Sequence, residues 1–374
     1  MPETARHQPA RRWRLGRSTR IGGLAALIAA VAVGTWCLGV WASRADPRDA
    51  FARPSAVQQY AAATPLERLG CALFFDPILS GPRTIACVNC HVPELGWTDG
   101  RSHAVGVRGP ITLRAPTLLD VADAAPLGWD GKFPSAGSVI FTAITGPANM
   151  GGSESEALAR LQSDPRYVDL YRVAFPDAPG GPVTRRNTEE AMVSFLRRIR
   201  SGPAPFDRWV AGDPSAIGPE AQRGFALFVG KAGCSQCHSG WRFTDDSFHD
   251  IGLAREDEPG RGRLFPSSLK LKHAFKTPTL RDVALRRAFM HDGSLKTLQE
   301  VIDAYDRGGT ARPSRSELIR PLNLTATEKS ELVAFLRTLT SETPGTIPER
   351  FCPWPLPSRS QDGQTEAAAT DGHP

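Results

Sequence analysis

Net charge is scarce in this sequence once its first residues are set aside. The formal charge of the 374 residues is +6, but residues 1–20 contain six arginines and a single acid, Glu3. The rest of the chain therefore carries only about +1, which gives no support to a basic nucleic-acid-binding patch. We expect no nucleic-acid partner, and the clustered arginines are interpreted as a topology signal.

An apolar run without any charge follows the arginines. Residues 21–41, IGGLAALIAAVAVGTWCLGVW, lie behind a basic flank, which is the arrangement of an export signal. The run is long enough to span a membrane, so it is either an uncleaved anchor or a cleaved signal peptide. Both alternatives predict that the chain from about residue 46 onward is periplasmic. Only an uncleaved anchor, residues 21–41, would also tether the protein to the inner membrane.

Strand patterns are equally scarce, whereas helical patterns are frequent. No run of alternating apolar and polar residues with turn signals occurs. Residues 187–200 place four large apolar side chains on one helical stripe, and Thr297 and Thr325 each begin a capping box before an amphipathic run. The sequence therefore predicts a mostly α fold, preceded by the apolar export or anchor helix.

The few cysteines are arranged in a diagnostic way. Four of the seven fall in two CxxCH motifs, Cys87-Val88-Asn89-Cys90-His91 and Cys234-Ser235-Gln236-Cys237-His238. In such a motif two thiols attach to the haem vinyl groups and the histidine binds the iron. A redox dithiol needs no adjacent histidine, and two Cys with one His leave a zinc ion short of ligands. We therefore predict two covalently bound haem c groups, with His91 and His238 as iron ligands.

The two motifs suggest a duplicated plan with one haem in each half. Residues 46–202 are predicted to form the first haem domain and residues 203–343 the second, as two cytochrome c-like domains packed together. Residues 1–45 are the export segment, and the tail at residues 344–374 is expected to be largely disordered. Cys71 and Cys352 could pair in an oxidising compartment, although the sequence does not bring them together.

Side chains that could fill the sixth position of each iron are also few. A haem with two strong protein ligands transfers electrons, whereas a haem with an open position binds peroxide or oxygen. Outside the export segment and the two motifs, the histidines and methionines are His103, His249, His273, His291, His373, Met150, Met192 and Met290.

Several motifs resemble those of the bacterial di-haem cytochrome c peroxidase and MauG family. They are LGCALFFD at 69–76, APT at 115–117, WDG at 129–131, GP at 146–147, FDR at 206–208, FKTPTLR at 275–281 and MHDG at 290–293. The resemblance covers about residues 55–340 in a specific order. It implies a reactive haem on Cys87, Cys90 and His91, and an electron-relay haem on Cys234, Cys237 and His238.

The same resemblance gives roles to three further residues. Trp129 takes the position between the two haems, although a core tryptophan is the simpler interpretation. Tyr305 takes the place of the axial ligand of the second iron, which is a Met in conventional peroxidases and a Tyr in MauG. A phenolate oxygen stabilises oxidised iron better than a thioether does. The alternatives are a buried core tyrosine at this position and His291 as the ligand, but the family favours His291 as a haem-pocket residue.

Two departures from the family concern the first haem. The loop histidine that caps the reactive iron in the family would fall at about Gly106. His103 is nearby but does not align with that position, and we interpret it as a surface residue. We therefore expect an open haem at His91. The acid used in peroxide cleavage is replaced by Asn149, which cannot accept a proton as a base. Glu154 is a candidate substitute, and the usual upstream Gln falls at Val139.

A third departure concerns a calcium ion between the haems. The Asn that binds it is replaced by Arg114, whose guanidinium cannot ligate Ca²⁺ and opposes its charge. Thr277 and Pro278, near the other calcium ligands of the family, are present. We expect no bound calcium, and we expect Arg114 to pair with haem propionates.

The leading hypothesis is a MauG-like di-haem oxidoreductase. It would react with hydrogen peroxide at the open haem and pass oxidising equivalents through Trp129 and the second haem. The partner that is oxidised would be a small redox protein, either a c-type cytochrome or a cupredoxin, or a protein substrate. Two alternatives remain: a conventional peroxidase that reduces peroxide to water, and a non-catalytic di-haem electron-transfer protein.

Overall fold

The computed structural model describes residues 46–54, 62–122, 124–343 and 352. The predicted export segment and nearly all of the predicted tail lie outside these residues. The described residues from Pro47 onward belong to one compact unit. Within the described ranges, no helix is both long enough and apolar enough to cross a membrane.

Helices make up most of the regular structure, as predicted. The α-helices of the described residues are α2 (Pro65–Phe75), α3 (Ala136–Thr145), α4 (Glu154–Ser163), α5 (Pro165–Ala174), α6 (Arg185–Leu196), α7 (Pro205–Val210), α8 (Pro219–Val229), α9 (Leu298–Arg307) and α10 (Ala326–Arg337). Two antiparallel pairs of very short strands accompany them: β1 (Val105–Gly106) with β2 (Gly109–Pro110), and β3 (Phe248–His249) with β4 (Phe275–Lys276).

The helix starts follow their capping residues. The Thr297 and Thr325 side chains accept hydrogen bonds from the third residue of α9 and α10, so both predicted capping boxes are confirmed. The predicted helix at 187–200 is shorter than expected at its end, because α6 stops at Leu196 and the chain then turns. Ile199 is nevertheless buried, beyond the end of the helix.

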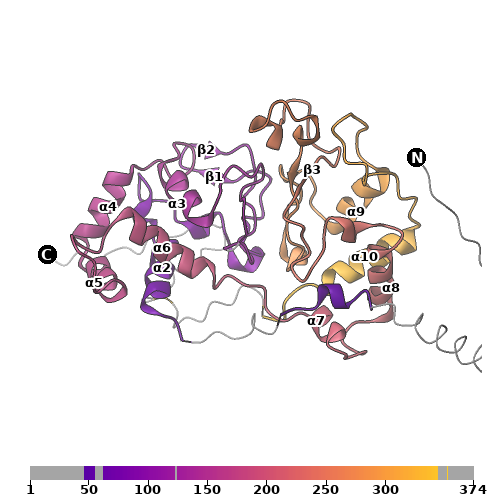
Figure 1. Ribbon diagram of the computed structural model, residues 1–374, viewed down its shortest axis with the longest axis horizontal. Helices are drawn as coiled ribbons and strands as arrows, with labels where there is room; N and C mark the ends of the chain where they lie inside the picture. The colour runs from indigo at the N-terminus through magenta and orange to yellow at the C-terminus, as the bar shows by residue number, and fades with distance from the viewer. Residues whose placement is uncertain (1–45, 55–61, 123, 344–351, 353–374) are drawn as a thin grey trace, which may run out of the picture. The chain divides into compact units, whose positions relative to one another are not determined.

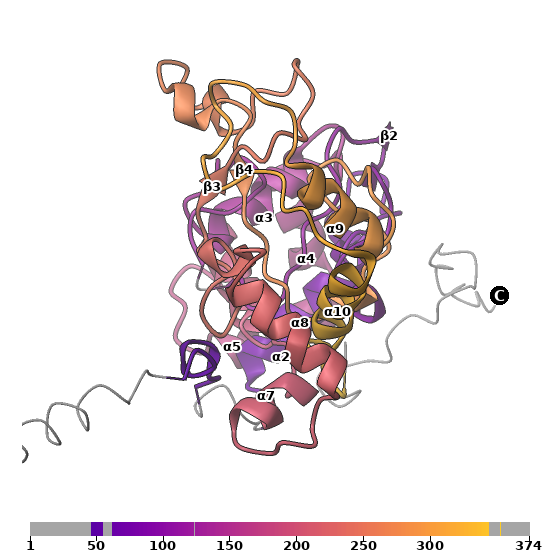
Figure 2. The ribbon, with the colours of Figure 1, turned by 90° about the vertical axis from the view of Figure 1, so that its right-hand side faces the viewer.

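Buried apolar side chains of the described residues form three clusters, two in the first half of the chain and one, the second core, in the other half. In Figure 1, α2 to α6 gather on one side and α7 to α10 on the other. Figure 2 gives the view from the side of α8 to α10. The second core also contains Phe51, whose ring stacks on Phe243 at 4.9 Å. The boundary between two haem domains near residue 202 remains a prediction. Phe51 belongs to the first of these predicted domains in sequence but packs with residues of the second.

A disulfide connects the C-terminal tail to the first half. Cys71 of α2 and Cys352 are bonded, with their Cα atoms 5.4 Å apart and their positions 281 residues apart in the sequence. Both are buried. The pairing left open by the sequence is therefore present, and a disulfide of this kind suits an oxidising compartment.

Candidate haem sites

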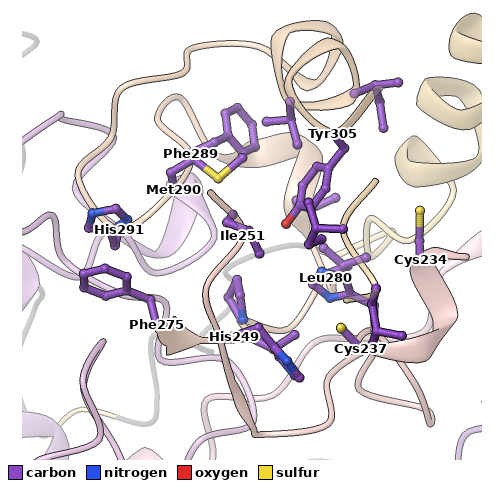
Figure 3. Close-up of a pocket in the computed structure, with 18 of the residues that line it drawn as sticks. Cys234, Cys237, His249, Ile251, Phe275, Leu280, Phe289, Met290, His291 and Tyr305 are labelled. Carbon is purple, nitrogen blue, oxygen red and sulfur yellow. The ribbon is translucent and has the colours of Figure 1, made fainter. Parts of the chain in front are cut away.

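The second CxxCH motif opens onto a large cavity. Cys234 begins a short 3-10 helix just after α8, and Cys237 and His238 follow it. The cavity has a volume of about 170 Å³ and is lined by residues from both halves of the chain. Figure 3 shows Tyr305 pointing into it opposite Cys237. Trp129 also lines it, so the structure brings together the side chains predicted for the second haem and its link to the first.

Both motif histidines are held in a form suited to metal binding. The His238 Nδ1 hydrogen-bonds to the carbonyl oxygen of Phe243 at 3.0 Å, and the His91 Nδ1 does so with Trp97 at 3.3 Å. Each bond leaves Nε2 as the unprotonated nitrogen. Burial lowers the pKa of His91 to about 4 and also lowers the pKa of His238. Both imidazoles are therefore neutral, as metal ligands must be.

The motif cysteines do not have the properties of a redox dithiol. All four are free thiols in the structure. Burial raises the pKa of Cys87 to about 12, of Cys90 to about 11 and of Cys234 to about 12. Reactive CxxC dithiols have lowered pKa values instead. Half-buried thiols beside a neutral histidine fit covalent haem attachment, and Cys234 and Cys237 also line the cavity.

Tyr305 lies on α9 and faces the same cavity. Its phenol makes no hydrogen bond with any described residue, and burial, with a further contribution from Cys234 and Cys237, raises its pKa. A phenol in this setting stays protonated unless a cation takes the place of the proton. An iron in the cavity is such a cation, so the position suits the predicted axial ligand.

Trp129 is fixed in place by main-chain contacts. Its indole Nε1 donates to the carbonyl oxygen of Arg114 at 3.0 Å, and its own carbonyl oxygen accepts from the Lys276 N–H at 2.9 Å. The guanidinium of Arg114 lies 4.9 Å from the centroid of the Trp129 ring. Trp129 is thus a residue of the first half that is anchored beside the second motif.

Two buried guanidinium groups line the cavity without an acidic partner. Arg114 donates to the carbonyl oxygens of Met290 and Ala115, and Arg286 donates to those of Thr279 and Arg281. Among the described residues, neither forms an ion pair with a carboxylate. Burial lowers the pKa of Arg114 to about 10. Burial, and then the charge of Arg114, lowers that of Arg286 to about 9.

Buried cations of this kind are costly unless an anion compensates them. Haem propionates would supply that anion at this place, so the cavity fits haem on three counts: thiols, histidine and cations. The sequence led us to Arg114 but not to Arg286, because Arg286 lies outside every motif. Residues 281–287 contain three arginines, but nothing in the sequence distinguishes Arg286 from the other two.

His291 lies in the cavity wall, as expected of a haem-pocket residue. Its ring stacks on Phe275 with 3.7 Å between centroids, and its Nε2 is 3.3 Å from a carboxylate oxygen of Glu258. Figure 3 shows His291 on the side of the cavity away from the two cysteines. The sequence did not indicate Glu258, because it lies in an acidic stretch that reads as solvent-exposed.

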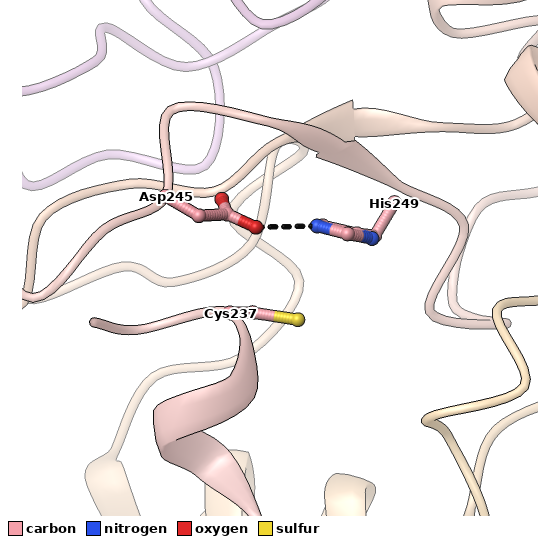
Figure 4. Close-up of side chains that lie close together, drawn as sticks. All are labelled: Cys237, Asp245 and His249. Atoms are coloured by element: carbon pink, nitrogen blue, oxygen red, sulfur yellow. Dashed lines mark hydrogen bonds and ion pairs between the residues drawn. The ribbon is translucent and has the colours of Figure 1, made fainter.

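His249 is a further histidine of this cavity to which the sequence gave no role. Its Nε2 hydrogen-bonds to Asp245 at 2.8 Å, and the Cys237 sulfur lies close to both (Figure 4). The bond to Asp245, and next the one to Cys237, raises the pKa of His249 to about 10. These three residues have the composition of a metal site, but Cys237 belongs to the haem motif.

A tight hairpin formed by β1 and β2 contacts the first CxxCH motif, where the Cys90 Sγ lies 3.9 Å from the carbonyl oxygen of Val105. A Cβ atom on Gly106 would lie 1.8 Å from the carbonyl oxygen of Ala148, and the Val107 N–H donates to the carbonyl oxygen of Asn149 at 2.9 Å. No side chain fits at Gly106, so a capping histidine there is sterically excluded. His103 is exposed and bonds to the carbonyl oxygen of Thr112, as its surface interpretation predicted.

The residues considered for peroxide cleavage at the first haem, Asn149 and Glu154, differ in their surroundings. Asn149 is half-buried, and its side-chain amide makes no hydrogen bond with a described residue. Glu154 is the first residue of α4, and its carboxylate accepts from Arg185 at 2.7 Å with 41% of the side chain exposed. This surface ion pair gives no support to Glu154 as the replacement acid. The side chain of Val139, on α3, cannot supply a hydrogen bond.

Comparison with known proteins agrees with this geometry. The family model described as di-haem cytochrome c peroxidase matches residues 64–215. The chain is 46% identical over 298 residues to the methylamine utilization protein MauG of Methylorubrum extorquens, covering 78% of this chain and 84% of the relative. It is 40% identical over 306 residues to the MauG protein of Methylophilus methylotrophus, covering 80% and 90% respectively.

A solved structure supports the same conclusion. A MauG-like protein associated with microbial copper homeostasis matches with a TM-score of 0.72 and 29% identity, over 80% of this chain and 95% of that one. The site and these relatives define a di-haem peroxidase-type oxidoreductase with two haem cofactors. The chain belongs to the di-haem cytochrome c peroxidase and MauG family, and its likeness to MauG confirms the family expected from the sequence.

Proposed function

We propose that this enzyme is a periplasmic, MauG-like oxidoreductase that uses hydrogen peroxide to oxidise a redox protein or a protein substrate in methylamine utilisation. Relatives at 46% and 40% identity are methylamine utilization proteins, which supports that setting. The export-type segment and the Cys71–Cys352 disulfide support the periplasm. The proposal includes two alternatives for residues 21–41: they are removed as a signal peptide, or they tether the protein to the inner membrane.

The convergence of Tyr305, Trp129 and His238 on one cavity is the observation that carries this function. Two covalently held haem c groups, one in each predicted domain, would supply the iron that reacts with peroxide and stores oxidising equivalents. Cys87 and Cys90 would hold the first, and Cys234 and Cys237 the second. The chain contributes neutral histidines as ligands, two guanidiniums for the propionates and an indole between the halves.

The residues around the first haem favour an accessible iron. Backbone fills the position of a capping side chain at Gly106. Asn149 has a free amide that can donate a hydrogen bond to bound peroxide but cannot act as a base. We infer that the first haem binds peroxide readily and cleaves it without the usual acid, which disfavours rapid turnover as a conventional peroxidase.

Electron paramagnetic resonance of the ferric protein tests the ligand assignments. We expect one high-spin signal from the His91 site and one low-spin signal from the His238 site. His91→Gly removes the first signal. Tyr305→Phe changes the second and shortens the lifetime of the spectrum produced by stoichiometric peroxide. Two low-spin signals would favour an electron carrier, and fast steady-state turnover with a reduced cytochrome would favour a conventional peroxidase.

Calcium does not fit the position between the two halves. The Arg114 guanidinium already binds two main-chain carbonyl oxygens there, and Arg286 adds a second buried charge. A divalent cation would be repelled by both. We propose that Arg114 is the resident cation at this position and that the enzyme works without calcium.

A further inference from the structure

A surface segment next to β3 and β4 has exposed apolar side chains. This projecting segment, residues 259–272, contains two short 3-10 helices (Arg261–Arg263 and Leu269–Leu271) and stands out at the top of both Figure 1 and Figure 2. Leu264, Phe265 and Leu269 are 41%, 45% and 57% exposed. They are half of the exposed large apolar residues among those described, and such a cluster marks an interaction site.

The charge of the projecting segment has one sign. It contains no acidic residue, and its basic residues are Arg261, Arg263, Lys270 and Lys272. Lys270 is exposed and has no ion-pair partner among the described residues. Lys272 pairs at 3.4 Å with Glu256, which is itself highly exposed. The segment therefore presents an apolar centre with an excess of positive charge, which complements an acidic protein face.

Contacts connect this surface to Asp130, the residue that follows Trp129 in the chain. The Arg261 guanidinium lies 5.0 Å from the ring centroid of the exposed Phe265 and 4.0 Å from that of Phe248. The same guanidinium donates to the carbonyl oxygen of Asp130 at 3.0 Å. Asp130 directly follows Trp129 and also pairs with Arg263. Packed groups thus run from the exposed ring to the residue beside Trp129.

We propose that the projecting segment is the docking surface for an acidic redox protein that this enzyme oxidises. The proposal rests on the proposed function, since peroxide is the oxidant. Each partner molecule would give up one electron near Phe265, so two partners are oxidised as H₂O₂ takes two electrons and two solvent protons to form two waters. A second copy of this chain fits less well, because it would bring like charges together.

The test uses two reduced reporters, an acidic cupredoxin (plastocyanin) and a basic single-haem cytochrome c, with the full-length holoenzyme and peroxide. We expect faster oxidation of the acidic reporter, at a rate that falls with added salt. The Leu264→Ser/Phe265→Ser/Leu269→Ser variant and, separately, Lys270→Glu should each slow that reaction about tenfold. Val173→Ser and Arg186→Glu, which are also exposed but lie on α5 and α6, are the matched controls and should keep the wild-type rate.

The peroxide-induced spectrum without a reporter separates this proposal from the proposed function. It should be the same in all variants, and its absence from the wild type would count against the function instead. If the variants of the projecting segment oxidise the reporters at the wild-type rate, or if the wild type prefers the basic reporter, the docking proposal is wrong. So would patch-dependent binding to phosphatidylglycerol vesicles, which indicates a membrane, or patch-dependent dimerisation in size-exclusion chromatography, which indicates a second copy.

Discussion

At the scale of single residues, buried cations distinguish the second haem cavity as much as its ligands do. Arg114 and Arg286 face it from different halves of the chain, and main-chain carbonyls are their hydrogen-bond acceptors. Each carbonyl contributes only part of a charge, so the pair retains a strong preference for anions. This arrangement would hold haem propionates, and its positive charge would oppose a second cation, as proposed above.

The calcium-free proposal leads to a residue-scale prediction. Treatment of the wild type with excess EGTA should leave its ferric magnetic resonance spectrum and its peroxide-induced spectrum unchanged. Arg114→Asn removes the resident charge and restores an oxygen ligand, so this variant should bind calcium and become sensitive to EGTA. A wild-type spectrum that changes on chelation and recovers with added calcium would contradict the assignment of Arg114.

His249 gives a second prediction at this scale. Its pKa is raised from an ordinary value of 6.5 to about 10, chiefly by Asp245. A raised folded-state pKa stabilises the protein fully below 6.5, and this contribution is lost as the pH rises through about 10. His249→Gln should therefore lose more stability at pH 6 than at pH 10. Urea unfolding of both proteins at the two pH values measures the difference, and an equal loss at both would refute the charged pair.

The sequence identified residues of this site only where a spacing or a family motif marked them. CxxCH fixes its own cysteines and histidine, and Tyr305 could be found by its place in an ordered set of motifs. Glu258 and Arg286 could not, because each reaches the cavity through tertiary packing and has no fixed spacing to a motif. Glu154 was suggested by proximity in sequence alone, and the helix dipole and Arg185 hold it at the surface instead.

At the scale of elements, the two halves use the same device to pack a helix before each haem motif. Residues 70–74 of α2 read GCALF, and residues 224–228 of α8 read GFALF. In each, the glycine allows another helix to approach closely. A Cβ on Gly70 would lie 2.1 Å from the carbonyl oxygen of Ala191 in α6, and one on Gly224 would lie 1.9 Å from that of Glu331 in α10.

These close approaches lead to a prediction about stability. Gly70→Ala and Gly224→Ala should each destabilise the protein, by about 1–3 kcal/mol, because the added methyl meets rigid backbone. Gly137→Ala is the matched control in α3, where the nearest atom to an added Cβ is 3.9 Å away. It should be neutral or stabilising by about 0.5–1 kcal/mol. Thermal unfolding of the three variants checks this, and equal effects would exclude the packing argument.

At the scale of the whole molecule, the chain ends cross between the two halves. Phe51, from the start of the described chain, packs in the second core, and Cys352, from its end, is bonded into the first. The duplicated plan could be predicted because each half carries its own motif. The crossings could not be predicted, because one aromatic side chain and one cysteine outside the two motifs carry no information about which distant core receives them.

The disulfide therefore links the end of the chain to the opposite half, and its removal tests that link. Because it closes a loop of 281 residues, its loss should lower the free energy of unfolding by about 2–5 kcal/mol through greater freedom of the unfolded chain. Cys71→Ala/Cys352→Ala and wild type treated with dithiothreitol should show similar losses in urea unfolding. The covalent haem content, measured as the pyridine haemochrome, should stay unchanged in both, because thioether bonds resist the reductant. Unaltered stability in both samples would mean that packing alone holds residue 352 in place.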